Sequence, residues 1–195
     1  MKCAWCDGPV ESSGSRGRTS RFCSGRCRTA ACRHRKRLPD ELDRTTRWIR
    51  WADRDGAKVP VNARGHAIDA HKPSNWRPVE DVSQSPRRGF VLAGDGIVCI
   101  DIDHCLDSSG NPKPWTRALL RRFPSTWTEV SPSGDGLHVW GLVDTPSAAG
   151  PCLRSFRGHR IEIYADKRFI TITGRPLPRC PITLANLQEA IDTLN

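Results

Sequence analysis

The sequence predicts an α+β fold in which a body with a mixed or antiparallel sheet follows a small basic head. Three observations predict it. Apolar, β-branched runs such as residues 97–102 are interspersed with segments of helical composition. Tight, Gly-containing turns separate several of these runs, which favours antiparallel neighbours. Cysteine and arginine crowd the N-terminus. The length of 195 residues suffices for one such domain with a small appendage.

The head, residues 1–38, carries most of the net charge of +10, because it contains ten Lys or Arg and only two Asp or Glu residues. A compact basic segment is typical of a nucleic-acid contact. A disordered basic tail without a single partner would have the same charge. The cysteines distinguish these alternatives.

Two close cysteine pairs, in "CAWC" and "CSGRC", are separated by sixteen residues. This spacing is typical of a tetrahedral zinc site, and the connecting loop is too poor in apolar residues to fold without metal. The predicted ligands are Cys3, Cys6, Cys23 and Cys27. Cys32 and His34 remain alternative ligands in a basic helix over 27–38. The segment resembles a small treble-clef or FCS-like zinc finger.

Pro39 marks the predicted boundary between this zinc module, 1–38, and the body, 39–195. A helix over 40–51 with Asp40 as its N-cap opens the body. A short strand follows at 56–61, then a loop and a short helix within 72–85. Two apolar runs joined at Gly94-Asp95-Gly96 predict a β-hairpin over 89–103.

Pro114 opens a predicted helix over 114–123. Residues 126–143 read as strand, Gly-rich turn and strand, and 160–174 as a hairpin that turns at 165–167. A helix capped by Thr183 closes the chain. The N-terminus lacks the apolar core of a signal peptide and no apolar run approaches the length of a membrane span, so we expect a cytoplasmic protein without membrane contact.

Asp101 and Asp103 stand two residues apart at the end of the apolar run "IVCIDI". On a strand such residues point to one face, and two neighbouring carboxylates repel each other unless a proton or cation lies between them. A hard divalent ion such as Mg²⁺ is the usual solution. The alternative is a strand end that reaches solvent before the turn at 107–110.

Two further motifs carry candidate groups. In "SPSGDGLHVWG", Gly134 and Gly136 form a loop whose backbone N–H groups suit phosphate, and His138 follows on the exit strand. Glu162 is a lone carboxylate on an apolar strand, as a third ligand of a two-metal site would be. The alternatives are a structural sheet histidine and an exposed Glu162 paired with Arg168 across the hairpin.

These motifs occur in the order DhD, S-x-S-G-x-G-x-H and "hEhY…RFhThTG", where h is apolar. The order resembles the archaeo-eukaryotic primase superfamily, and more closely the bifunctional DNA primase/polymerase (prim-pol) N-terminal domains of phages and plasmids. The resemblance covers residues 47–176. It implies an RRM-like catalytic sheet packed with a second α/β unit and an active site in the cleft.

The resemblance also implies roles for individual residues. Asp101, Asp103 and Glu162 would be catalytic carboxylates that bind Mg²⁺ or Mn²⁺. The nucleotide-binding residues would be His138 on the triphosphate, Ser131, Ser133 and Gly134 in the phosphate loop, Arg168, and Lys58 in "GAKVP". Zinc would be structural.

The implied function is a DNA-directed nucleotidyltransferase that makes primers or DNA on a single-stranded template from nucleoside triphosphates in a bacterial host. Many similar proteins continue into a helicase, so a separate replicative helicase is an expected partner unless the chain works alone. One alternative is a zinc-finger DNA-binding module with a degenerate primase-like domain. Another is a metal phosphohydrolase with Asp101 as nucleophile, although Cys105 stands where such enzymes have Thr or Val.

Overall fold

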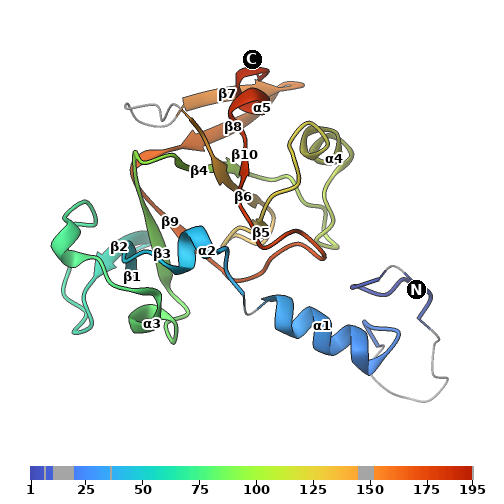
Figure 1. The fold of residues 1–195 in the computed structure, drawn as a ribbon, viewed down its shortest axis with the longest axis horizontal. Coiled ribbons are helices and arrows are strands. Elements are labelled where there is room, and N and C mark those ends of the chain that lie inside the picture. The colour runs from blue at the N-terminus through green and yellow to red at the C-terminus, as the bar shows by residue number, and fades with distance from the viewer. Residues whose placement is uncertain (7, 11–19, 36, 145–151, 195) are drawn as a thin grey trace.

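A computed structural model of the chain describes residues 1–6, 8–10, 20–35, 37–144 and 152–194, without the side chains of residues 34 and 35. Helix α1 (Gly25–Arg35) lies between the N-terminal segment and the body (Figure 1). None of the helices in these described ranges is long and apolar enough to cross a membrane.

The first half of the body contains α2 (Asp40–Asp43), β1 (Trp48–Arg54), β2 (Ala57–Val61), the 3₁₀ helix η1 (Pro73–Asn75), α3 (Val79–Val82), β3 (Arg88–Ala93) and β4 (Ile97–Ile102). The second half contains α4 (Pro114–Leu120), β5 (Thr128–Val130), β6 (Leu137–Leu142), β7 (Cys152–Phe156), β8 (His159–Tyr164), β9 (Asp166–Ile172), β10 (Ala185–Asn186) and α5 (Gln188–Asp192).

The strands form two sheets. The small sheet has the order β2-β1-β3-β9, and all its pairs are antiparallel. The large sheet has the order β10-β6-β4-β8-β7, and β5 pairs with β6 beside β10. Its pairs are antiparallel except β10 with β6. The predicted α+β class with antiparallel sheets is therefore confirmed.

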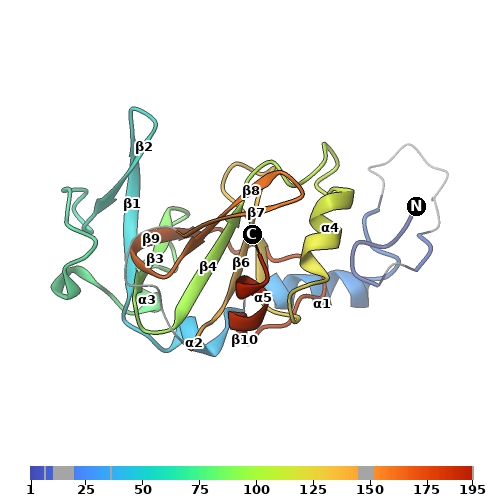
Figure 2. The same cartoon turned by 90° about the horizontal axis from the view of Figure 1, so that it is seen from above.

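Helices α4 and α5 cover one face of the large sheet, and the small sheet packs on the other (Figure 2). Alternation along the strands produces these two cores. Ile100, Val139 and Ile163 point to the helices. Cys99, Trp140 and Tyr164 point to the small sheet, where the Phe90 and Trp140 rings pack in a T-shaped arrangement at a centroid distance of 5.9 Å. We call this second layer the inter-sheet core.

The predicted helix over 40–51 is wrong after its first turn. The helix α2 ends at Asp43, and Trp48 to Arg54 form β1 instead. Trp48 is fully buried between the sheets, and burial of its large apolar surface there outweighs helix propensity. Asp40 is not the cap, since Pro39 holds that position, and its carboxylate instead accepts a hydrogen bond from Arg44.

Both predicted body hairpins around 94–96 and 165–167 are wrong in pairing, although their strands exist. β3 pairs with β1 and β9, whereas β4 pairs with β6 and β8. Likewise β8 belongs to the large sheet and β9 to the small one. Each of the two tight turns therefore carries the chain from one sheet to the other. The C-terminal helix also starts later than predicted, with Leu187 and not Thr183 at its N-cap.

Candidate active site

Four polar residues form a row across the large sheet. Glu129, His138, Asp101 and Glu162 are direct cross-strand partners on β5, β6, β4 and β8. Directly opposed residues share a face of a sheet, so these side chains stand together. Each lies two residues from a member of the inter-sheet core. The row is therefore on the face that packs against the small sheet, at the end of the inter-sheet core.

Asp101 lies at the centre of the row. Burial raises the pKa of Asp101 above its ordinary value; His138 and Lys58 oppose this shift, whereas the nearby carboxylates of Asp103 and Glu162 add to it. Its Oδ1 atom is buried and has no hydrogen-bond partner within the described part of the chain. A buried, unpartnered carboxylate oxygen beside other carboxylates is a chemical fit for a hard divalent cation.

The other two carboxylates flank Asp101. Asp103 follows β4 directly and is exposed. Glu162 forms an ion pair with Arg160, at 2.7 Å, and accepts a hydrogen bond from the Tyr164 hydroxyl. Burial and this bond to Glu162 raise the pKa of Tyr164 to about 12. The guanidinium of Arg168, the alternative partner of Glu162, instead lies over the Tyr164 ring, with its Cζ atom 5.1 Å from the ring centroid.

The carboxylates do not converge on one point. Among the described residues, the one group of three or more metal-ligating side chains whose donor atoms lie within 4.8 Å of one another consists of cysteines. The Glu162 carboxylate instead contacts the side chains of Arg160 and Tyr164. A metal held by Asp101, Asp103 and Glu162 together would therefore require rearrangement of at least one of these side chains.

Two cavities meet at Asp101. The first, about 470 Å³, is rich in cations, and we call it the basic cavity; its lining includes Lys58, His71, Asp101, His138, Lys167 and Arg168. The second, about 340 Å³, we call the acidic cavity; its lining is Asp101, Asp103, His104, Gly158, His159, Arg160 and Glu162. Lys58 and Arg168, predicted from the sequence, thus lie beside His138. His71 and Lys167 were missed because no motif marks them.

His138 is almost completely buried between two carboxylates. Its Nε2 atom lies 3.7 Å from Asp101 Oδ1, and its Nδ1 atom lies 3.6 Å from Glu129 Oε1. Both distances exceed hydrogen-bond length. Sequence reasoning missed Glu129, although one signal was available: like Glu162, it is a lone carboxylate within a predicted strand.

The predicted phosphate loop lies beside the row. Ser131 Oγ and Ser133 Oγ are 2.9 Å apart, and Ser133 donates to Asp135 Oδ1 at 2.6 Å. Asp135 Oδ2 also meets His104 Nδ1 at 2.6 Å. These contacts with Ser133 and His104 lower the pKa of Asp135. The loop is thereby fastened to the turn after β4. Neither serine, nor Gly134, lines the two cavities.

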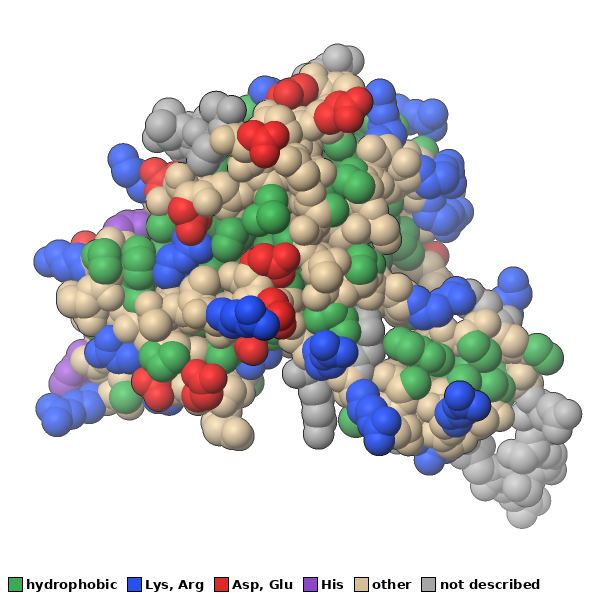
Figure 3. Space-filling model, viewed as in Figure 1, with side chains coloured by type: hydrophobic (Ala, Val, Ile, Leu, Met, Phe, Trp, Pro, Cys, Tyr) green, Lys and Arg blue, Asp and Glu red, His purple; other side chains and the backbone are tan. Residues whose placement is uncertain are grey.

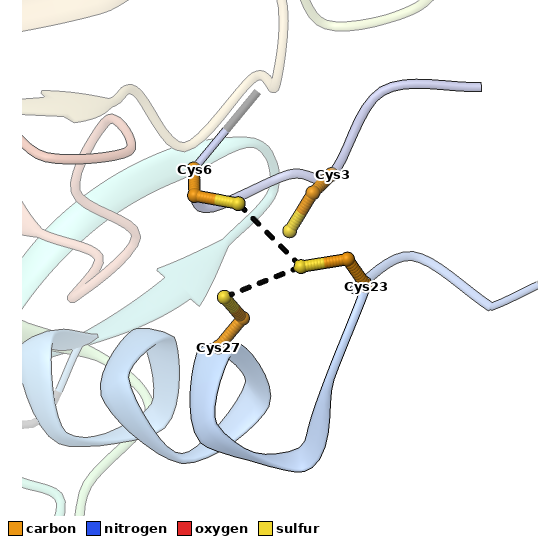
Figure 4. Close-up of side chains that lie close together, drawn as sticks. All are labelled: Cys3, Cys6, Cys23 and Cys27. Carbon is orange, nitrogen blue, oxygen red and sulfur yellow. Dashed lines mark hydrogen bonds between the residues drawn. The ribbon is translucent and has the colours of Figure 1, made fainter. Parts of the chain in front are cut away.

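The four predicted zinc ligands converge at the other end of the chain. Their sulfur atoms lie within 4.8 Å of one another, with Cys23 Sγ 3.5 Å from both Cys6 Sγ and Cys27 Sγ (Figure 4). Cys27 comes from the first turn of α1, and the other three from the preceding segments. The arrangement is consistent with a zinc module. Cys32 is exposed and outside this group, and the side chain of His34 lies outside the described part of the chain.

The pKa values within this cysteine cluster diverge. Burial raises the pKa of Cys3, but hydrogen bonds from the backbone of Cys23, Cys6 and Trp5 together outweigh this effect. The pKa of Cys3 is therefore lowered, to about 6. Hydrogen bonds with the thiols of Cys6 and Cys27 raise the pKa of Cys23 to about 12. A bound cation would remove this competition for protons, because thiolates are the species that ligate metals.

No family model matches the chain. A curated protein, the DNA primase-polymerase of Nitratiruptor phage NrS-1, is 34% identical to it over 142 residues. The match covers 68% of this chain but 20% of that protein, so the chain spans about a fifth of its relative's length. The resemblance drawn from the three ordered motifs is confirmed by this relationship: the chain is a homologue of the phage NrS-1 DNA primase-polymerase.

Proposed function

We propose that the chain is a DNA primase-polymerase that joins nucleotides on a single-stranded DNA template. The observation that carries the proposal is the meeting of the basic and acidic cavities at Asp101. Nucleotidyl transfer needs such a junction, because a polyanionic triphosphate must lie beside carboxylates without being repelled by them. The name of the phage relative supports the same assignment.

The basic cavity would hold the nucleoside triphosphate. Lys58, Lys167 and Arg168 supply positive charge along its wall, and the guanidinium of Arg168 can make paired hydrogen bonds to a phosphate group. His138 lines the same cavity. These groups would orient the α-phosphate toward Asp101. Ser131, Ser133 and Gly134 would support this wall from the adjoining loop.

The acidic cavity would hold the divalent metals. Asp101 and Asp103 would be the first ligands, and Glu162 would join them after release from Arg160. Bound Mg²⁺ or Mn²⁺ ions would supply activation of the 3′-hydroxyl and neutralisation of the phosphate charge. The chain's own residues would place the reactants in line, which together with charge stabilisation is the main source of rate in phosphoryl transfer.

The head would form a second functional unit, residues 1–38, attached to a catalytic body, 39–195. Cys3, Cys6, Cys23 and Cys27 would hold one structural zinc ion. Template DNA would contact its Lys and Arg side chains through phosphate groups, which every sequence offers alike.

The test is synthesis without a primer. Single-stranded DNA, labelled nucleotides and Mg²⁺ or Mn²⁺ should yield template-dependent products with release of pyrophosphate. Asp101→Asn and Asp103→Asn should each abolish them while DNA binding persists. Release of inorganic phosphate without chain growth would favour a phosphohydrolase instead. DNA binding without any metal-dependent incorporation would favour the degenerate binding module.

A further inference from the structure

Glu129 is a fully buried carboxylate to which neither the motifs nor the proposed chemistry gives a role. It lies on the short strand β5, with 0% of its surface exposed. Glutamate is almost never fully buried without partners, because removal of its charge from water is costly. Its position therefore needs a specific explanation.

The partners of Glu129 hold it in one place. Its Oε2 atom accepts hydrogen bonds from Thr173 N at 3.0 Å, from Thr173 Oγ1 at 2.8 Å and from Gly174 N at 2.8 Å. All three donors belong to the segment directly after β9, the small-sheet strand whose residues line the basic cavity. The carboxylate is thus fixed between the two sheets.

The other oxygen of Glu129 faces His138. Oε1 also accepts a hydrogen bond from Thr173 N at 3.2 Å and lies 3.6 Å from His138 Nδ1, and Glu129 and His138 are direct partners in the β5–β6 register. His138 Nδ1 is itself buried, and no group in the described ranges gives it a hydrogen bond. Glu129 is therefore the acceptor best placed for an Nδ1 proton, and a shift of a few tenths of an ångström would complete that bond.

We infer that Glu129 is a positioning residue that keeps His138 oriented with its Nδ1–H toward Glu129 and its Nε2 toward the basic cavity. The inference rests on the proposed function, because it assumes that a nucleotide occupies that cavity. A fixed carboxylate at one ring nitrogen determines which nitrogen carries the proton and how the ring is turned. Without Glu129 the imidazole would lose this constraint, and the nucleotide would lose an oriented contact.

A double-mutant cycle tests the inference. Titration calorimetry would measure the affinity for dATP and for ATP, each with Mg²⁺, in the wild type, Glu129→Gln, His138→Ala and the double variant. We expect Glu129→Gln to weaken binding about 10-fold alone and at most about 2-fold in the His138→Ala background, as coupled neighbours do. Glu80→Gln, an exposed charge removal on α3, should leave the affinity unchanged. Equal weakening in both backgrounds, or no weakening, would overturn the inference.

A second variant covers the case in which Glu129→Gln does not fold. Thr173→Val removes the Oγ1 donor to Glu129, together with the contacts of Oγ1 with Val130 O and Arg175 N, and keeps the two backbone N–H bonds to Glu129. It should weaken binding about 3-fold and do so only when His138 is present. Additive behaviour of Thr173→Val would again contradict the inference.

The orientation of the ring has its own readout. Nitrogen-15 NMR of labelled histidine in the full chain, recorded without nucleotide, should show a proton on Nδ1 of His138. A His138 ring protonated on Nε2 alone would overturn the inference. A wild type that binds neither nucleotide while its His138 keeps the Nδ1 proton would overturn the proposed function, and the positioning role in nucleotide binding with it.

Discussion

At the scale of single residues, Asp101 combines two properties that conflict in the absence of a cation. It is half-buried, and it stands beside two further carboxylates. The i, i+2 spacing of Asp101 and Asp103 was readable from the sequence, because it depends only on the two-residue period of a strand. The contacts of Glu162 with Arg160 and Tyr164 were not readable, since they depend on side-chain rotamers.

The raised pKa of Asp101 yields a stability prediction. Because burial raises the pKa in the folded state, ionisation of Asp101 disfavours folding, and this penalty is relieved as the pH falls through the folded-state pKa. In buffer without Mg²⁺ or Mn²⁺, Asp101→Asn should therefore increase the free energy of unfolding at pH 7 by about 1 kcal/mol. Urea denaturation of both proteins at pH 7 and pH 5 measures this difference in the free energy of unfolding.

Two controls accompany that measurement. Asp43→Asn, an exposed change on α2, should leave stability unchanged at both pH values. The gain from Asp101→Asn should be smaller at pH 5 than at pH 7. A destabilising effect of Asp101→Asn at pH 7 would show instead that the ionised carboxylate has a favourable partner in the free protein.

At the scale of elements, strands were easier to predict than their partners. The runs that form β3 and β4 were recognised because burial on both faces leaves a continuous apolar pattern. Those of β8 and β9 were recognised because apolar and polar residues alternate along them. Their assignment to two sheets was not, since a tight turn is equally compatible with a hairpin and with passage between layers. The inter-sheet core, with Trp48, Phe90 and Trp140, decides that question.

The loop between β5 and β6 gives an element-scale prediction. A Cβ atom at Gly136 would lie 2.7 Å from Ser131 Oγ and 2.9 Å from the carbonyl oxygen of Ile102, closer than side chains tolerate. Gly136→Ala should push this loop away from the end of β4, destabilise the fold by about 1–3 kcal/mol and weaken nucleotide binding. Thermal unfolding and calorimetric titration check both effects.

A glycine in open space is the matched control for Gly136. Nothing lies within 4 Å of the position of an added Cβ at Gly25, so Gly25→Ala should change neither stability of the body nor nucleotide affinity. If Gly136→Ala bound nucleotide like the wild type, the proposed support of the basic cavity by this loop would be wrong.

At the scale of the whole molecule, charge is unevenly divided. On the face shown in Figure 3, Lys and Arg side chains lie on the N-terminal segment and across the body, whereas the Asp and Glu side chains in view lie mainly on the body. The convergence of four cysteines was predictable because metal sites obey strict spacing. The position of the head beside the body was not predictable, since no periodic pattern encodes it.

The cysteine cluster leads to a metal prediction. Elemental analysis of the full chain should find about one zinc ion per molecule, as four thiolates hold one tetrahedral ion. Cys23→Ser should lose most of this zinc, because Cys23 lies within reach of both Cys6 and Cys27. Cys32→Ser, outside the cluster, should keep it. Retention of zinc by Cys23→Ser would move the site to other ligands.

The last prediction concerns what the basic head contributes. Starting a chain is harder than extending one, because no primer duplex holds the template and two nucleotides must be ordered together. Residues 1–38 contain ten Lys or Arg and two Asp or Glu, a surplus that can grip a template through its phosphates. Deletion of 1–38 should therefore impair unprimed synthesis at least about 10-fold more than extension of a supplied primer.

Salt provides the control, because phosphate contacts weaken steeply as ionic strength rises. Raised salt should reproduce the initiation defect in the intact chain and add little to it in the deleted one. Primed and unprimed synthesis would be compared for both proteins over the same salt series. An equal loss of both activities on deletion would make the head a source of general DNA affinity, whereas no loss would assign its charge to a different partner.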